Sequence, residues 1–541
     1  MGISIHNIEI TLLVLVVLVA LLAVFARRLK VPYPIILVLG GLALGFIPWV
    51  PDVRLSPTVV FLVILPPLIF ASALNTPWRE FKFNIISISM LGLGLVIFTV
   101  VGVAVFAHLV IPGFDWRTGA VLGALISPTD IIAVSAIAKR VGLPHSVLQV
   151  IDGESLINDA AGLLALQFTT ALVVSGSVPS LSQGFGQLVW LIVGGVAVGI
   201  LIAFLVTRFD RLLIGRFSAG TDLQMLVSLA TPYFAYLLGE AIGASGVLAT
   251  VACGLYVGRS LSETVSSRAR LDTRVVWNTV DFALNGFVFI IIGLQLPSIL
   301  SGISRNGTIP LDWPRMIGEA LLVCAIVIVL RYLWILPGAR IAHFLRTRLQ
   351  KQKIRTTSKR ELVVMGWSGI RGVLTLAAAL SVPFVTDTGT HFPNREAIIF
   401  LAYAVILVTL VGQGLTLPAL IRRLGISEPK SEQDEEREAR KTMLQFVIQT
   451  LRGMDTSEDE IATQAVDQLI RVYDQRLQGI SSTSEKQVEA QLDRKYREVA
   501  RRLRTAQRRE LNRLRNQGRF REATLRRLER ELDLMELRWG D

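Results

Sequence analysis

The chain has 541 residues, of which 52% are hydrophobic and only 18% are charged. Soluble domains carry about a quarter charged residues, so this composition excludes an ordinary soluble protein. The formal charge of +13 does not indicate a nucleic-acid-binding protein, because the basic residues lie between apolar runs and in the C-terminal part. The two cysteines, Cys253 and Cys324, stand in separate apolar runs. We therefore expect no disulfide framework, no metal cluster and no cofactor.

The apolar residues form about thirteen segments, each long enough to cross roughly 30 Å of hydrocarbon. The segments are 8–26, 32–49, 57–74, 84–111, 117–138, 145–174, 187–207, 221–239, 242–258, 275–297, 314–340, 361–384 and 396–420. The sequence thus predicts an all-α polytopic membrane protein.

The loops between these segments alternate in charge. One set is rich in arginine and lysine, as in Arg27–Lys30, Arg208–Arg216 and Arg340–Arg360, whereas the other set is nearly uncharged. Lysine and arginine are retained on the cytoplasmic side, so we expect the N-terminus outside and the C-terminus in the cytoplasm. A plasma membrane location is expected, which is the inner membrane in a bacterium.

The composition changes after the last apolar segment. Residues 426–541 are roughly 40% charged, with both signs mixed and apolar residues at helical spacing. We divide the chain into a transmembrane domain, 1–425, and a cytosolic helical region, 426–541. The second region is either a regulatory or dimer-strengthening element, bound by an unknown regulator, or a solvated helical appendage.

The densest group of polar residues within apolar segments begins at SPTD, Ser127–Asp130. Pro128 removes a backbone donor and interrupts its helix, which places Thr129, Asp130 and freed carbonyls at mid-membrane. In the next segment Ser155 and Asp159 are four residues apart and share a helical face. An ionisable residue in the membrane is a functional candidate by default. Thr129, Ser155 and Asp159, with carbonyls and water, offer the oxygens that a small hard cation such as Na⁺ needs.

Two cations in the second half of the chain are candidate partners of these acids. Arg371 stands between Gly369 and Gly372 in an apolar segment that the glycines loosen, and Arg331 stands in VIVLRYLWILP. An interrupted segment in each half predicts an inverted repeat, with two discontinuous helices that cross at the midplane beside the ion site. Arg371 is expected to face the negative ends of broken helices or a carboxylate. Arg331 is expected to pair with Glu154.

Each residue has a plainer interpretation as well. Asp159, the chief ion-binding candidate, could be a structural partner of one of the two arginines. Asp130 either binds the ion or caps backbone donors at the helix break. Glu154 is expected to be structural, Arg371 to stabilise the crossing, and Asn158 to be a hydrogen-bonding spacer.

The chain resembles the cation/proton antiporters of the NhaP and eukaryotic sodium/hydrogen exchanger family over about residues 1–425. The most specific motif is GESLINDA, Gly153–Ala160. The other similar motifs are SPTD, LPPLIF at 65–70, SGVLATVACGLYVG at 245–258 and GIRG at 369–372. The resemblance implies thirteen helices, a homodimer built from a dimerisation domain and a moving core, and elevator-like alternating access.

Carried over by motif, the resemblance implies that Thr129, Ser155 and Asp159 coordinate the ion, that Asn158 is the neutral partner of the aspartate, and that Glu154 is the buried salt-bridge acid. An Asn–Asp pair in that family is associated with electroneutral exchange. The chain departs from the family in two places. Ile131 stands where the pattern has a proline, and Ala71 where it has an acidic residue.

These observations predict a secondary transporter, not an enzyme. The expected activity is electroneutral exchange of Na⁺ or Li⁺ for H⁺ at Asp159, with lipid and a second copy of the chain as partners. A K⁺/H⁺ antiporter on the same scaffold is the alternative. A membrane sensor without ion flux is an alternative of another class.

Overall fold

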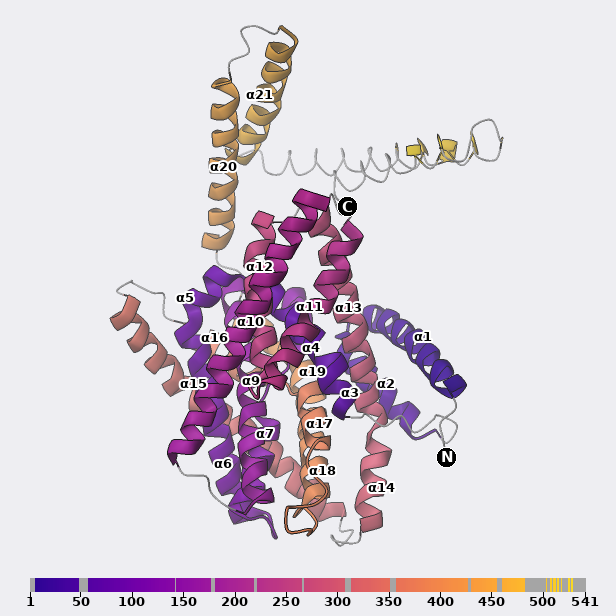
Figure 1. The fold of residues 1–541 in the computed structure, drawn as a ribbon, viewed down its shortest axis with the longest axis vertical. Helices are drawn as coiled ribbons and strands as arrows, with labels where there is room; N and C mark the ends of the chain where they lie inside the picture. The colour runs from indigo at the N-terminus through magenta and orange to yellow at the C-terminus, as the bar shows by residue number, and fades with distance from the viewer. Residues whose placement is uncertain are drawn as a thin grey trace. The chain divides into compact units, whose positions relative to one another are not determined.

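The computed structural model describes residues 5–47, 57–141, 143–176, 181–217, 221–264, 267–306, 313–350, 357–426, 430–454 and 460–481, with scattered residues beyond 481. Across these ranges every regular element is a helix, and the only strand-like pairing is one isolated bridge between Val385 and His391. The chain divides into two compact units, Met1–Glu428 and Pro429–Asp541. Figure 1 shows the helices of both units.

The helices of the first unit follow one another along the chain. Their bounds are α1 Ile5–Leu29, α2 Tyr33–Gly45, α3 Pro57–Val59, η1 Val60–Ile64, α4 Leu65–Asn75, α5 Trp78–Ser89, η2 Met90–Gly94, α6 Leu95–Val110, α7 Trp116–Ile126, α8 Ile131–Val141, α9 His145–Val174, α10 Leu181–Phe217, α11 Thr221–Ala241, α12 Gly246–Thr264, α13 Ser267–Leu294, α14 Leu296–Asn306, α15 Trp313–Gln350, α16 Lys359–Trp367, α17 Val373–Leu380, α18 Arg395–Leu407, η3 Val408–Gln413 and α19 Gly414–Leu424, where η marks a π-helical segment.

Eight of the described helices are long and apolar enough to cross a membrane. The predicted all-α membrane fold is therefore confirmed, whereas the count of thirteen spans stays a prediction. The segment predicted at 84–111 belongs to one continuous helix from Trp78 to Val110 that contains η2. Helix α14 was not predicted as an element of its own.

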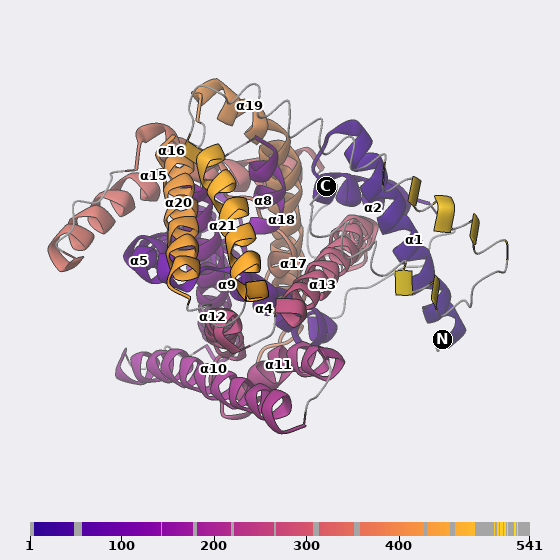
Figure 2. The same ribbon diagram turned by 90° about the horizontal axis from the view of Figure 1, so that it is seen from above.

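One group of helices packs through small residues. A Cβ on Gly199 of α10 would meet the backbone of Ala249 in α12, and a Cβ on Gly258 of α12 would meet the backbone of Leu74 in α4. Gly41 of α2 approaches the backbone of α13 in the same way. Close backbone approach at small residues is the usual way in which helices associate in a bilayer. We call α1, α2, α4 and α10–α13 the scaffold group; Figure 2 shows α10 and α11 along one edge of the bundle, beside α12.

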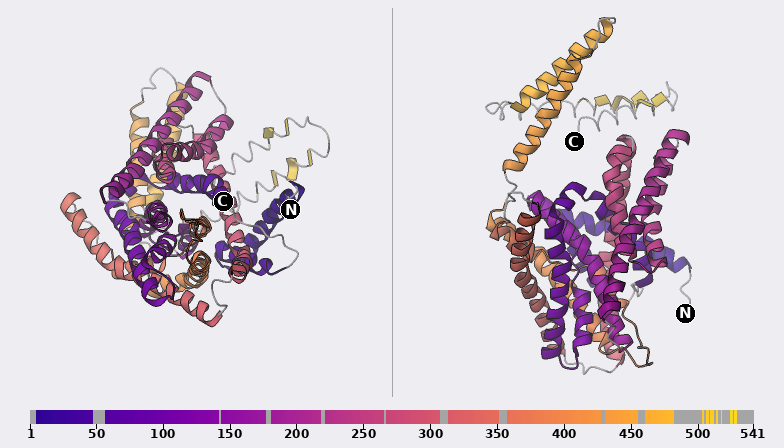
Figure 3. Two further views of the ribbon diagram at one scale, coloured as in Figure 1. Left: turned by 60° about the horizontal axis from the view of Figure 1, so that its bottom comes forward. Right: turned by 60° about the vertical axis from the view of Figure 1, so that its left-hand side comes forward.

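A second group, α5–α9 and α15–α19, surrounds the polar motifs, and we call it the core group. Gly119 and Gly123 of α7 pack against the backbone of α6, and Gly102 of α6 packs against Leu330 of α15. The right-hand view of Figure 3 shows the helices of the bundle lengthwise.

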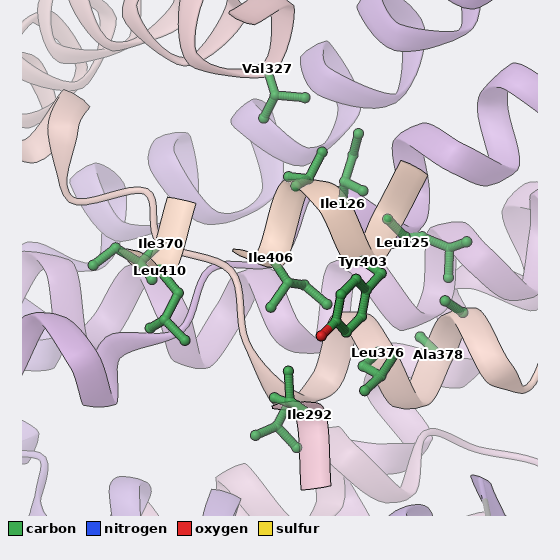
Figure 4. Close-up of a cluster of buried hydrophobic side chains, with 14 of the residues drawn as sticks. Leu125, Ile126, Ile292, Val327, Ile370, Leu376, Ala378, Tyr403, Ile406 and Leu410 are labelled. Atoms are coloured by element: carbon green, nitrogen blue, oxygen red, sulfur yellow. The ribbon is translucent and has the colours of Figure 1, made fainter. Parts of the chain in front are cut away.

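The centre of the core group is apolar. Ile126 at the end of α7 and Ile370 lie with Leu376, Tyr403 and Ile406 in one cluster of buried side chains (Figure 4). This cluster packs residues of both interrupted helices against each other.

In the second unit, α20, Lys430–Arg452, packs against α21, Glu460–Ser481. Arg452 and Asp474 join the two helices through an exposed ion pair of 3.5 Å. The charged segment from 485 to 517, which the sequence predicted to be helical, lies largely outside the described residues.

Candidate ion-binding site at a helix crossing

The first interruption follows the SPTD motif. Helix α7 begins at a capping box formed by Asp115 and Thr118 and ends at Ile126, and α8 begins at Ile131. The four residues between the helices are not helical. Pro128 has no N–H to continue the helix, and its ring packs against Gly162 of α9, where a Cβ would collide with it. The break is therefore set by Pro128 and accommodated by Gly162.

The second interruption lies at GIRG. Helix α16 ends at Trp367 and α17 begins at Val373. Arg371 therefore lies in the non-helical segment between the two helices, whereas its apolar surroundings in the sequence had suggested a helix. The backbone N–H of Asp130 donates to the carbonyl of Ile370 at 2.7 Å. Each half of the chain thus has the interruption that the sequence predicted. The two interruptions, residues 127–130 and 368–372, meet at a point that we call the crossing.

Arg371 binds the carbonyl ends of two broken helices. Its Nε donates to the carbonyl of Ile126, the last residue of α7, at 3.0 Å, and its Nη1 donates to the carbonyl of Gly369, just after α16. Its backbone N–H donates to Thr409 Oγ1 at 3.1 Å. A helix C-terminus carries a partial negative charge. The buried guanidinium therefore neutralises the C-terminal ends of α7 and α16.

Asp130 lies at the opposite, positive ends. Its Oδ1 accepts from the backbone N–H of Ile132 at 2.8 Å, in the first turn of α8. Its Oδ2 packs against Gly372, the residue that precedes α17. This oxygen is buried and has no hydrogen-bond partner among the described residues. Asp130 thus stands where the N-terminal ends of α8 and α17 converge, and one of its oxygens remains available.

Side chains of α9 bind the non-helical residues between α7 and α8. Ser155 Oγ donates to the carbonyl of Thr129 at 2.7 Å, and Asn158 Nδ2 donates to Thr129 Oγ1, also at 2.7 Å. All three residues are buried. These bonds fix Thr129 against the face of α9 that carries Asp159, one turn beyond Ser155.

Glu154 and Arg331 form the ion pair that the sequence predicted. Arg331 Nη1 and Nη2 donate to the two carboxylate oxygens at 2.6 and 3.0 Å, and the two side chains are 1% and 0% exposed. Arg331 also donates from Nε and Nη2 to the carbonyl of Met365 in α16. The pair therefore ties α9 to α15 and α16.

A cavity of about 370 Å³ lies between the crossing and the scaffold group. Thr129, Asp130, Ser155 and Asp159 line it, whereas Asn158, Glu154, Arg331 and Arg371 are buried behind its wall. Within the described ranges no hydrogen bond or ion pair engages the Asp159 carboxylate. The alternative in which Asp159 is paired with one of the two arginines finds no contact in the structure.

The cavity is also lined by residues to which the sequence analysis assigned no role. Asp152 of α9, Asp281 of α13 and Tyr33 of α2 all line it. Ala71 and Ile131, the two positions that depart from the family pattern, also line the cavity. Asp281 and Tyr33 come from the scaffold group, and no local pattern relates them to the SPTD and GESLINDA motifs.

Comparison with known proteins gives the family of the chain. The family profile described as "Sodium/hydrogen exchanger, transmembrane" matches residues 13–423. The chain belongs to the sodium/hydrogen exchanger family. It is therefore a multi-pass membrane transporter of the cation/proton antiporter type and not an enzyme.

Relatives in the sodium/hydrogen exchanger family span nearly the whole chain. An uncharacterized Na⁺/H⁺ exchanger of Mycobacterium tuberculosis is 34% identical over 97% of this chain and 96% of its own length. A sodium, potassium, lithium and rubidium/H⁺ antiporter of Bacillus subtilis is 32% identical over 88% of this chain and 70% of its own length. The solved sodium proton antiporter MjNhaP1 of Methanocaldococcus jannaschii has the same fold, with a TM-score of 0.60 and 20% identity over 77% of this chain and 99% of its own.

Proposed function

We propose that this chain exchanges Na⁺ or Li⁺ for H⁺ and that both ions bind in turn to Asp159. The observation that carries the proposal is the state of the Asp159 carboxylate. It lines a cavity of about 370 Å³, while both nearby arginines have other partners, Arg331 in Glu154 and Arg371 in the carbonyls of the crossing. An ionised carboxylate inside the membrane is energetically unfavourable when no protein cation neutralises it. Binding of a proton or a metal ion removes that unfavourable charge.

The cation ligands in this proposal are oxygens around Asp159. Ser155 Oγ and Thr129 Oγ1 each retain lone pairs after the hydrogen bonds that fix them, and both residues line the cavity. Oδ2 of Asp130 is a further oxygen without a partner. Water in the cavity completes the shell of the transported ion.

The exchange is electroneutral in this proposal because one proton replaces one monovalent cation on one carboxylate. Asn158 is buried behind the wall and donates to Thr129, which is a neutral structural role. Asp130 keeps the same charge in both states of the cycle in this proposal, because only Asp159 exchanges the proton for the cation. The net charge that crosses the membrane in a cycle is then zero.

The cavity lies between two groups of helices, and this arrangement supports alternating access by an elevator movement. Asp159, Asp130 and the crossing all belong to the core group, so the core can carry the loaded carboxylate past the scaffold group as one body. We place the N-terminus outside and the C-terminus in the cytoplasm, and we propose that two copies associate through the scaffold group.

Substitution of Asp159 by asparagine tests the function directly. We expect D159N to retain the fold and to lose exchange, measured as collapse of a pH gradient in proteoliposomes on addition of Na⁺, Li⁺ or K⁺. The conservative variant D159E keeps a carboxylate and should retain partial exchange. Full exchange by D159N would refute the assignment.

A K⁺/H⁺ antiporter on the same scaffold is the second candidate. The name of the Bacillus subtilis relative includes potassium and rubidium, and this observation supports testing K⁺ as a substrate. The same assay with K⁺ as the only cation separates the two. A sensor without flux, the third possibility from the sequence, predicts no collapse of the gradient with any cation.

A further inference from the structure

Asp281 is a carboxylate of the cavity to which the proposed exchange assigns no role. It lies in α13 of the scaffold group, and it lines the same cavity as Asp159 and Asp130 of the core group. The cavity therefore has carboxylates on both sides of the boundary between the two groups, and only those of the core group belong to the proposed binding site.

Neighbouring side chains fix Asp281 at this wall. Asn285, one turn further along α13 and fully buried, donates from Nδ2 to Asp281 Oδ1 at 2.9 Å. Phe282 packs its ring against Tyr33, with 5.4 Å between ring centroids, and Tyr33 also lines the cavity. The hydrogen bond within α13 holds the carboxylate, and the ring contact with α2 holds the neighbouring part of the wall.

We infer that Asp281 is a cation-attracting residue of the transporter: it draws the monovalent cation into the cavity from the scaffold side and presents it to Asp159. A cleft lined by one sign of charge concentrates counter-ions, because its low-dielectric walls focus the field. Asp281 adds a fixed negative charge that stays with the scaffold group when the core group moves. The inference rests on the proposed exchange at Asp159 and goes beyond it.

The variant D281N distinguishes a purely structural role of Asp281 from attraction of the cation. In D281N the new amide oxygen can still accept the hydrogen bond from Asn285, so the variant keeps this contact and loses the negative charge. A residue that merely holds α13 in place therefore tolerates this change. A residue that attracts the cation does not.

The experiment measures exchange in proteoliposomes and separates the apparent KM for Na⁺ from the maximal rate. We expect D281N to raise KM roughly five- to tenfold at low ionic strength with the maximal rate retained, and D281E to stay within about twofold of the unchanged chain. Added choline chloride should shrink the difference, because salt screens the field. Asp272, on the same helix and outside the cavity lining, gives the matched control D272N, with an unchanged KM.

An unchanged KM in D281N overturns the inference, as does an equal rise in D272N, which would show a general effect of charge. A KM in D281E as high as in D281N also overturns it. D159N is measured in parallel. If D159N is inactive while D281N has the original KM, only this inference fails; if D159N still exchanges ions, the proposed function fails first.

Discussion

The backbone N–H of Asp130 donates to the carbonyl of Ile370 at 2.7 Å, and this bond joins two interruptions that are 240 positions apart in the chain. Around it, Arg371 binds the carbonyl ends of α7 and α16, while Asp130 stands at the N-terminal ends of α8 and α17. Non-helical backbone is tolerated in a membrane only where protein or a watery cavity satisfies it. The crossing meets that requirement with one cation and one anion, each at the helix ends of opposite sign.

Gly372 is needed for this arrangement. A Cβ at this position would collide with the carboxylate of Asp130, which leaves no room for any other side chain. We expect G372A to displace Asp130 or to open the crossing, and to reduce the exchange rate at least tenfold. Gly318 of α15 gives the matched control, because a Cβ there meets nothing within 4 Å. Exchange by G372A at the rate of G318A would contradict the prediction.

Breaking the buried Glu154–Arg331 pair is expected to destabilise the core group. Removal of one partner leaves an uncompensated buried charge, which costs about 3–5 kcal/mol. We therefore expect E154Q and R331M each to lower the free energy of unfolding by that amount, measured by denaturant titration in detergent micelles.

Two further variants test the cause of this loss. The double variant E154L/R331M removes both charges and should recover most of the stability, since an apolar pair of similar volume is often neutral or better. The exposed pair Arg315–Glu319 is the control, and E319Q should cost less than about 1 kcal/mol. A double variant as unstable as the single ones would show that packing, not the unpaired charge, is responsible.

Substitution of Ser155 should affect both a structural hydrogen bond and the proposed binding of the cation. Its Oγ donates to the Thr129 carbonyl at 2.7 Å and is also a proposed ligand of the cation. In S155A the buried carbonyl loses its donor, at a cost of about 1–3 kcal/mol, and the cation loses one oxygen. We expect a higher KM for Na⁺ than in S155T, which keeps the hydroxyl. Equal KM values for S155A and S155T would remove Ser155 from the ligand set.

The sequence indicated much of this site because its signals are local. Pro128 and the glycines of GIRG mark the interruptions, and the four-residue spacing of Ser155 and Asp159 places both on one face of α9. The Glu154–Arg331 pair followed from charge balance alone, since each is a buried ion that needs a partner.

What the sequence did not indicate depends on contacts between distant helices. Asp281 and Tyr33 reach the cavity because α13 and α2 pack together and face the crossing, and no spacing within either helix shows this. The π-helical segments η1, η2 and η3 lie within predominantly apolar runs, so periodicity could not reveal them. The extension of α5 to Trp78 was missed because Arg79, Glu80 and Lys82 interrupt the apolar pattern.

Competition at a single carboxylate predicts how exchange depends on pH. Na⁺ binds only when Asp159 has lost its proton, so a fall in pH must raise the apparent KM for Na⁺, and saturating Na⁺ must restore the maximal rate. Where the protonated form predominates, linkage requires KM to rise about tenfold for each unit by which the pH falls.

Asp130, Asp152, Asp281 and Tyr33 also line the cavity and change the electrostatic field at Asp159. The dependence of KM on pH is therefore measured both in the unchanged chain and in D281N. We expect the same slope in both with KM higher throughout in D281N, because Asp281 attracts the cation without exchanging the proton. An apparent KM that does not change between pH 6 and pH 9 would mean that proton and cation bind at different groups, and Asp159 could then not couple their movements.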